Sequence, residues 1–144
     1  GSRNYEKQKK RVALCHEKIR NQRKDFQHKL STGLAENYDA VCVEDLDLKG
    51  MAGELHFGKG VHDNGYGLFL SMLKYKLEER GKYLIKVNRY FASSKICSVC
   101  GKKKAELSLS ERIYYCECGN RMDRDVNAAV NIMNEGKRIF AECA

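Results

Sequence analysis

The sequence has 144 residues, 42% of them apolar, with seven cysteines and a formal net charge of +8 at pH 7. This size and composition predict a globular chain with a modest core, organised as one domain with or without a small insertion, and they argue against disorder. No apolar run approaches the roughly 20 residues of a membrane span and no signal peptide is recognisable, so we expect a soluble protein without a membrane partner.

The first predicted element is a long basic helix. Gly1 and Ser2 are typical of a cleaved tag and are left out of the fold prediction. Residues 3–30 contain no glycine or proline, and their larger apolar residues recur at helical spacing. This pattern predicts an amphipathic helix that ends at the Ser-Thr-Gly of residues 31–33. Its apolar stripe consists of Val12, Cys15, Ile19, Phe26 and Leu30.

That helix carries almost all of the excess positive charge. Residues 3–30 hold ten Lys or Arg against three Asp or Glu, whereas the rest of the chain holds 17 against 16. Such a segment favours a polyanion partner, most simply nucleic acid, because Lys and Arg neutralise phosphates and release counterions. A solvated helix face is the alternative interpretation. The candidate phosphate contacts are Arg11, Lys18, Arg20, Arg23 and Lys24.

A strand, a helix and a second strand are predicted next. Residues 40–43 form a short apolar run that ends in acidic residues beginning with Glu44, and the glycine-rich residues 48–64 predict a loop. Residues 67–80 return to helical spacing and 82–88 resemble a strand, so a parallel or mixed sheet is expected. The predicted inward residues of this helix are Leu68, Met72, Tyr75 and Leu77, with Gly81 as its C-cap.

Four cysteines in two tight pairs predict a zinc site. Cys97 and Cys100 are separated by two residues, Cys116 and Cys118 by one, and a glycine follows each pair. Two pairs of thiolates supply the four corners of a tetrahedron and leave no open position, so the predicted zinc is structural. The interval between the pairs suits a β-hairpin arm. Two disulfides or four unrelated thiols are the alternatives.

The three other cysteines, Cys15, Cys42 and Cys143, are scattered. An odd total is awkward for a disulfide framework, so we expect a reducing, cytoplasmic environment.

Acidic residues at element ends are candidates for a second metal site. Glu44 ends the first strand, and Asp125 begins a final helix over residues 125–140. Carboxylates at such positions can converge and bind Mg²⁺. Alternatively, Asp123 or Asp125 caps the helix and Glu44 is an exposed strand terminus. The final helix is expected to face inward with Val126, Ala129, Val130 and Met133.

Over almost its whole length the sequence resembles the C-terminal part of the TnpB family, transposon-encoded "OrfB with zinc ribbon" proteins ancestral to compact type V CRISPR nucleases. The similarity lies in residues 21–31, 43–46 with 49–51, 93–101 and 123–132. The resemblance implies an α/β fold, a truncated RNase H-like (RuvC-like) domain at 3–89 and 123–144 with a four-cysteine zinc ribbon inserted at 90–122. It also implies DNA and a guide RNA as partners, and cleavage of double-stranded DNA.

The resemblance assigns roles to residues. Glu44 and Asp125 match the second and third carboxylates that hold catalytic Mg²⁺ or Mn²⁺, and Asn127 and Asn131 match positions that support the site. Cys97, Cys100, Cys116 and Cys118 match the ribbon's zinc ligands. The family's first aspartate has no match here, so we expect a fragment that is inactive alone.

Three functions follow as hypotheses. The first is the C-terminal part of an RNA-guided DNA endonuclease. The second is a binding module whose ribbon contacts phosphates, although the same cations would also suit a solvated hairpin; they are Lys102, Lys103, Lys104 and Arg112. The third is an accessory transposition protein that acts through protein contacts, for example as a dimer through an open sheet edge.

Overall fold

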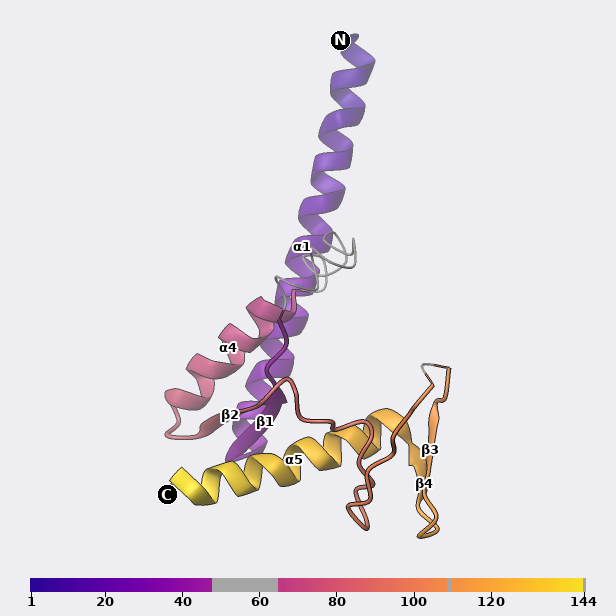
Figure 1. Cartoon of the computed structure of the whole chain (residues 1–144). Coiled ribbons are helices and arrows are strands. Elements are labelled where there is room, and N and C mark those ends of the chain that lie inside the picture. Colours follow the sequence, from indigo (N-terminus) through magenta and orange to yellow (C-terminus); the bar gives the residue numbers. More distant parts are fainter. Residues whose placement is uncertain (48–64, 109, 144) are drawn as a thin grey trace.

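The computed structural model describes residues 1–47, 65–108 and 110–143, so the loop expected at 48–64 lies outside the described residues. Helices and strands combine in a mixed helix and sheet architecture (Figure 1). The elements are α1 (Arg3–Asn37), β1 (Ala40–Glu44), α4 (Tyr66–Glu78), β2 (Tyr83–Val87), β3 (Ile113–Tyr115), β4 (Arg121–Asp123) and α5 (Arg124–Cys143).

A parallel two-stranded sheet lies at the centre of the body. β1 and β2 pair in parallel with Val41 opposite Leu84 and Cys42 opposite Ile85, which confirms the predicted strand, helix, strand arrangement. Val41 and Leu84 pack against a buried cluster of Ala35, Leu73 and Leu77 from α1 and α4. Each strand has one unpaired edge within the described residues, and the dimer through such an edge stays a prediction.

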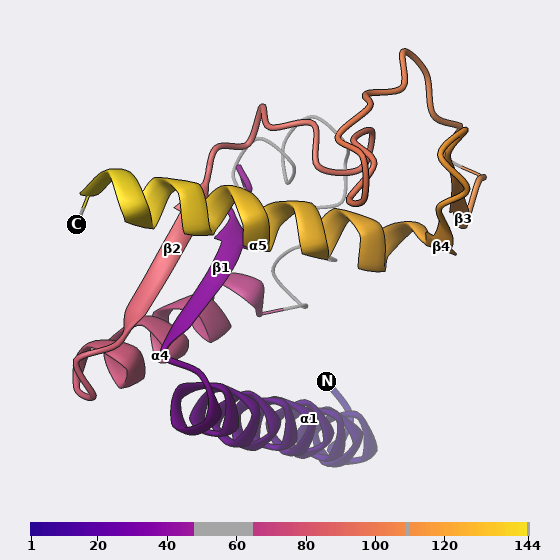
Figure 2. The same ribbon diagram turned by 90° about the horizontal axis from the view of Figure 1, so that it is seen from below.

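The other face of the sheet is covered by α5 (Figure 2). Gly136 makes this close approach possible. A Cβ atom at Gly136 would lie 2.3 Å from Cys42 Sγ and 3.7 Å from Ile85 Cγ2. Because side chains alternate across a strand, Cys42 and Ile85 face α5 while their neighbours face α1 and α4.

Helix α1 is longer than predicted. It continues through Gly33 to Asn37, so the stop expected at residues 31–33 is wrong. The Ser31 hydroxyl donates to the Gln27 carbonyl at 2.7 Å, and the Thr32 hydroxyl donates to the His28 carbonyl at 2.8 Å. These hydroxyls therefore bond inside the helix instead of breaking it.

The predicted apolar stripe of α1 is not its packed face. The buried residues of the helix are Gln27, Ser31 and Ala35, whereas Phe26 is 64% exposed. The N-terminal half of α1 extends away from the body (Figure 1). The stripe residues Val12, Cys15, Ile19, Phe26 and Leu30 are all exposed.

The packed faces of α4 and α5 also differ in part from the prediction. In α4, Met72 and Leu77 are buried as expected, but Leu68 and Tyr75 are exposed, and Leu73 and Lys76 are buried instead. Lys76 is accommodated because its ammonium group donates to three oxygen atoms of α1. Gly81, the predicted C-cap, lies three residues beyond the end of α4 with φ +65°.

In α5 the predicted inward residues Val126, Ala129 and Met133 are exposed and Val130 is half-buried. Asn127 and Asn131 are buried in their place. Their amides find backbone partners, so these two polar side chains are accommodated inside.

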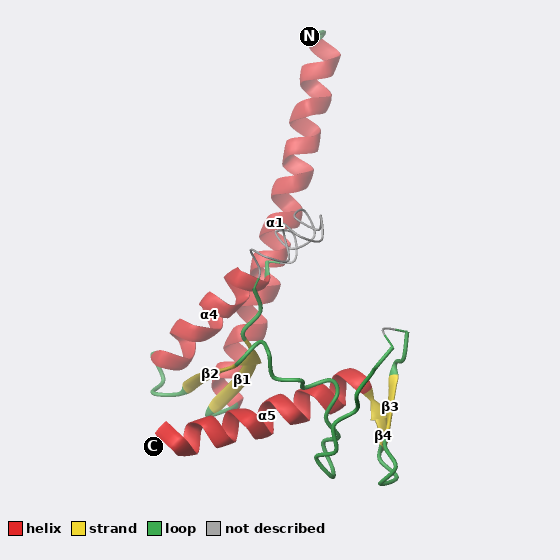
Figure 3. Ribbon diagram, viewed as in Figure 1, coloured by secondary structure: helices red, strands yellow, loops and turns green. Residues whose placement is uncertain are grey.

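Residues 89–123 form a loop-rich lobe beside the N-terminal end of α5. β3 and β4 pair antiparallel and bracket the second cysteine pair, so the hairpin turn carries Cys116 and Cys118. The hairpin was expected between the two pairs, and only β3 lies there. Figure 3 shows the two sheets at different positions along α5.

Candidate metal centre and flanking carboxylates

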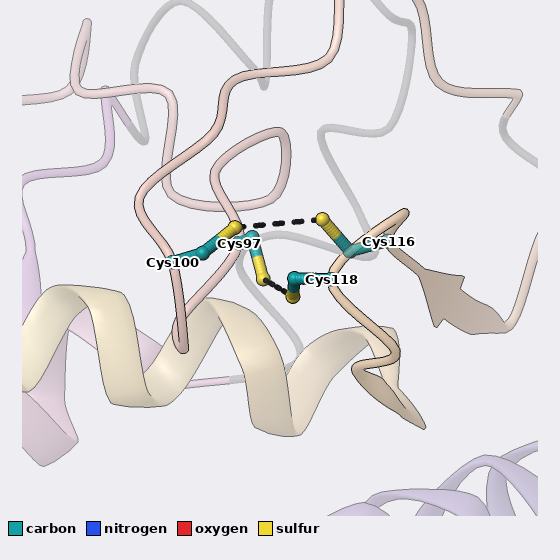
Figure 4. A group of neighbouring side chains, drawn as sticks. All are labelled: Cys97, Cys100, Cys116 and Cys118. Atoms are coloured by element: carbon teal, nitrogen blue, oxygen red, sulfur yellow. Dashed lines mark hydrogen bonds between the residues drawn. The ribbon is translucent and has the colours of Figure 1, made fainter.

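The four cysteines of the two pairs meet in one cluster. Their Sγ atoms all lie within 4.8 Å of one another, and in the described part of the chain this is the only group of three or more His, Cys, Asp or Glu ligands. Cys97 and Cys100 come from one loop and Cys116 and Cys118 from the hairpin turn, with the sulfurs directed toward each other (Figure 4).

The spacing of the sulfurs fits a tetrahedral zinc site. The distances are 3.7 Å between Cys97 and Cys118 and 3.6 Å between Cys100 and Cys116. Four sulfurs at about 2.3 Å from a central zinc would be about 3.8 Å apart. A disulfide would bring two sulfurs to about 2.05 Å, so these thiols are not arranged as disulfides.

The thiols do not ionise alike. Burial disfavours the thiolate of Cys97, but backbone N–H groups of Cys100 and Val99 and the Asn120 amide bring its pKa down to about 6. For Cys118 a backbone hydrogen bond from Asn120 favours the thiolate, yet the neighbouring thiols and burial prevail and raise its pKa to about 12. Four thiolates this close repel one another unless a cation lies between them, so the donor set fits Zn²⁺.

Local backbone geometry explains how each pair forms its turn. The glycine that follows each pair adopts a positive φ angle, +75° at Gly101 and +93° at Gly119. The Gly101 N–H donates to the Cys97 carbonyl at 2.9 Å, and the Gly119 N–H donates to the Cys116 carbonyl at 3.0 Å. A side chain at either glycine would strain these left-handed turns.

Two supporting residues were not foreseen from the sequence. Asn120 donates its side-chain amide to Cys97 Sγ at 3.4 Å. Tyr114 is fully buried under the cluster, and its hydroxyl donates to the Lys95 carbonyl at 3.1 Å. The sequence signal for Asn120 is its position directly after Cys118 and Gly119, where its amide can reach the sulfurs.

The two asparagines expected to support a site hold the first cysteine loop. Asn127 Oδ1 accepts from the Ser98 N–H at 3.0 Å, and Asn127 Nδ2 donates to the Ile96 carbonyl at 2.7 Å. Asn131 Nδ2 donates to the carbonyls of Ile96 and Ser93 at 2.6 and 2.8 Å. Both therefore fasten the loop around Cys97 to α5.

Glu44 lies half-buried at the end of β1, beside two other acids. Asp45 pairs with Lys86 and Arg89 at 3.3 Å, and Asp47 pairs with Arg89 at 3.1 Å. Glu44 has no ion pair within the described ranges, so its carboxylate is the one not committed to a cation.

Tyr66 lies close to this end of β1. Burial raises the pKa of the Tyr66 hydroxyl, and the negative charges of Glu44 and Asp45 raise it further. Tyr66 was not foreseen, since a single tyrosine at the start of a predicted helix gives no functional signal.

Asp123 and Asp125 have different roles at the start of α5. Asp123 Oδ1 accepts from the N–H groups of Asp125 at 2.8 Å and Val126 at 3.1 Å, so Asp123 caps the helix. The Asp125 side chain is 82% exposed, with Arg124 Nε 3.8 Å away.

Asp125 and Glu44 both sit on elements that pack together, β1 and α5. Asp125 precedes Gly136, the contact point with β1, by eleven residues, which is about 16 Å along a helix. Neither Glu44 nor Asp125 belongs to a group of three or more possible metal ligands among the described residues. The Mg²⁺ site at these two carboxylates therefore stays a prediction.

The predicted phosphate contacts fall into two groups. Arg11, Lys18, Arg20, Arg23 and Lys24 are exposed on α1. On the ribbon, Lys102 forms an ion pair with Glu117, and Lys104 Nζ lies 4.7 Å from the centre of the Tyr114 ring. Lys103 and Arg112 are exposed. The three ribbon lysines line a shallow groove together with Tyr115.

No helix of the described chain combines the length and apolar character needed to cross a bilayer.

Two family models match different parts of the sequence. Residues 1–54 match the OrfB/IS605 model, described as "Probable transposase", and residues 66–132 match the "Cas12f1-like, TNB domain" model. The second match spans the cysteine cluster and the start of α5.

Related proteins are found in bacteria and viruses. A "Putative RNA-guided DNA endonuclease" of Streptomyces pristinaespiralis is 39% identical over 94% of this chain and 34% of its own length. A "TnpB-like protein" of Acanthamoeba polyphaga mimivirus is 32% identical over 84% of this chain and 24% of its own length. The chain thus spans about a third or less of these relatives.

A solved structure shares the fold. The protein in "Cryo-EM structure of the Cas12f1-sgRNA-target DNA complex" superimposes with a TM-score of 0.68 and 24% identity, over 92% of this chain and 39% of that one. The arrangement of helices, sheets and cysteine lobe described above is therefore a known one.

Proposed function

This chain is a relative of the TnpB and OrfB transposon-encoded proteins, and from that premise we propose that it forms the C-terminal, RuvC-like and zinc-ribbon part of an RNA-guided DNA endonuclease. The observation that carries the proposal is the similarity over nearly the whole chain to proteins so named. DNA and a guide RNA are its proposed partners. In this proposal, residues 3–89 and 123–144 belong to an RNase H-like domain, and 90–122 form the inserted ribbon.

Two residues of the chain would hold the catalytic metal. Glu44 lies half-buried at the end of β1 with no ion pair among the described residues, and Asp125 is exposed at the start of α5, while Asp123 is used as a cap. Mg²⁺ or Mn²⁺ bound by such carboxylates stabilises the attacking and leaving oxygens of a phosphodiester. A third carboxylate from the rest of the parent protein would complete the site, so the chain alone is expected not to cleave DNA.

The ribbon has a separate task in this proposal. Cys97, Cys100, Cys116 and Cys118 would hold a structural Zn²⁺, because four thiolates leave no position for a substrate. The metal would thus shape the lobe that lies against α5 without taking part in hydrolysis.

The test uses the full-length parent protein loaded with its guide RNA. Glu44→Gln and Asp125→Asn should each reduce Mg²⁺-dependent cleavage of a matched DNA duplex by at least about 1000-fold while duplex binding persists. Asp47→Asn is the matched control, since Asp47 lies three residues after Glu44 but pairs with Arg89. Wild-type cleavage rates in both Glu44 and Asp125 variants would refute the proposal.

A non-catalytic nucleic-acid-binding module is the second candidate. The exposed cations along α1 favour it, because backbone binding needs clustered positive charge and no metal site. Binding of duplex DNA that weakens steeply with salt, in the absence of Mg²⁺, would support this function for the chain on its own. A binding constant that is unchanged between low and physiological salt would exclude it.

A further inference from the structure

Asn127 joins the cysteine cluster to the first turn of α5. The residue is completely buried, and its amide bonds the peptide groups on both sides of Cys97. It accepts from the Ser98 N–H at 3.0 Å and donates to the Ile96 carbonyl at 2.7 Å. The backbone that positions Cys97 is therefore bonded directly to α5.

The second cysteine pair reaches the same turn by another route. β4 follows Cys118 and ends at Asp123, which pairs with Ile113 of β3. Asp123 then caps α5 through the N–H groups of Asp125 and Val126. Both arms of the cluster thus end on the turn that carries Asp125.

Neither arm is held by apolar burial alone. The first loop contributes Cys97 and Ser93 to the buried residues, and the hairpin contributes Tyr114. A lobe with so small a core depends on its metal for order, as small metal-bound domains do. Loss of the metal should therefore loosen the partners of Asn127.

From these contacts we infer that Asn127 is a positioning residue, which couples zinc occupancy of the cysteine cluster to the conformation of the first turn of α5. The coupling is reciprocal: zinc orders the turn, and the bonded turn retains zinc. If Asp125 binds Mg²⁺, this binding should also depend on zinc. That consequence is the only one that rests on the proposed function.

The expected size of the effect follows from other metal sites. Residues that orient ligands without touching the metal typically change metal affinity by about 10 to 100-fold. Asn127 acts on two peptide groups at once, so Asn127→Ala should accelerate zinc release to a chelator by at least about tenfold. Asn134→Ala is the matched control, because Asn134 lies on the same helix and is exposed.

Hydrogen exchange of the whole 144-residue chain tests the coupling without any activity. Removal of zinc from the wild type should increase exchange at residues 124–129 by about tenfold or more, while residues 70–77 of α4 stay protected. Asn127→Ala should show fast exchange at 124–129 even with zinc bound, and zinc removal should add little. Asn134→Ala should behave like the wild type.

Two results would overturn the inference. One is unchanged protection of residues 124–129 in the zinc-free wild type while residues 95–118 lose theirs. The other is wild-type zinc release from Asn127→Ala. If residues 70–77 of Asn127→Ala are unprotected, Asn127→Asp is used in its place. This variant keeps the acceptor for the Ser98 N–H and loses one of the two side-chain donors to the Ile96 carbonyl, the other being Asn131. Its release rate should lie above that of the wild type, and an equal rate overturns the inference.

The outcome is separable from that of the proposed function. Zinc-dependent protection together with undiminished cleavage by the Asp125→Asn parent would leave the coupling valid and the catalytic assignment wrong. Protection that does not depend on zinc, together with loss of cleavage in the Asp125→Asn parent, would refute the coupling and leave the catalytic assignment intact.

Discussion

At the start of α5, two aspartates that are two positions apart have opposite surroundings. Asp123 makes two hydrogen bonds to helix N–H groups, whereas Asp125 points into solvent. From the sequence, either could have been the cap, and Asp125 was also the candidate metal ligand. The structure separates the two because only the residue immediately before the helix can reach the free N–H groups.

Asp123→Ala should lower the free energy of unfolding by about 1 kcal/mol, the usual cost of losing an N-cap. Asp125→Ala should change it by less than about 0.5 kcal/mol, because its charge near the helix end is exposed and screened. Urea denaturation of the zinc-loaded chain measures both. Equal losses for the two variants would contradict the assignment of Asp123 as the cap.

Lys76 is a buried cation that no sequence pattern pointed to. It is 7% exposed, and its Nζ donates to the His28 carbonyl, Ser31 Oγ and Thr32 Oγ1 at 2.7 to 2.8 Å. Burial, followed by the nearby Arg80 charge, lowers the pKa of Lys76 from its ordinary value of 10.5. The folded chain thus binds this proton less tightly than the unfolded chain.

That shift predicts a pH dependence. Between the lowered pKa and 10.5 the unfolded chain holds more protons than the folded one, so the contribution of Lys76 to stability rises with pH in this window. Urea denaturation of the wild type and Lys76→Met at several pH values from 8.5 to 10.5 measures this contribution. The difference between the two proteins isolates Lys76, because tyrosine ionisation affects both. The wild type should gain stability relative to the variant as pH rises, and a constant or shrinking difference would count against the assignment.

Among the elements, helix α1 was predicted correctly from sequence periodicity, but its end and its packed face were not. The absence of glycine and proline predicted the helix correctly, because only propensity and spacing were needed. Its end was misplaced, since hydroxyls at Ser31 and Thr32 can bond within a helix as well as break it. Val12, Ile19 and Phe26 recur every seven residues, a spacing that indicates a packing seam, but it does not say whether the partner lies in the same chain.

The face of α5 was mispredicted for a different reason. A search for apolar residues at helical spacing selected Val126 and Met133, which are exposed. The packed face instead carries Asn127 and Asn131, whose burial is favourable only because backbone groups of the cysteine loop meet them. Those partners are 29 to 38 residues away in sequence, so no local pattern contains them.

The two basic segments should contribute unequally to nucleic-acid binding. Arg11 and Lys18 on α1 have no acidic partner within the described residues, whereas Lys102 is paired with Glu117. Arg11→Gln with Lys18→Gln should reduce the slope of log K against log salt for duplex DNA by up to about 2, and Lys102→Gln by much less. Fluorescence anisotropy measures the slopes. A larger change for Lys102→Gln would locate the binding surface on the ribbon instead.

For the whole molecule, α5 is the shared element of two units. Its C-terminal part covers the β1 and β2 sheet through Gly136, and its first turns hold the cysteine lobe through Asn127. The sequence predicted the parallel sheet and the cysteine cluster separately, because each has its own local signature. Their connection through one helix depends on a glycine and two asparagines whose roles appear only when the elements are packed.

The proposed role of the cysteine cluster requires that it hold one zinc ion, which fixes the lobe against α5. Native mass spectrometry of the reduced 144-residue chain, with elemental analysis of the same sample, tests this directly. One zinc per chain is expected, and Cys97→Ser with Cys100→Ser should retain none. A wild-type chain that carries no metal after exposure to zinc, with all four thiols reduced, would show that the cluster is not a zinc site.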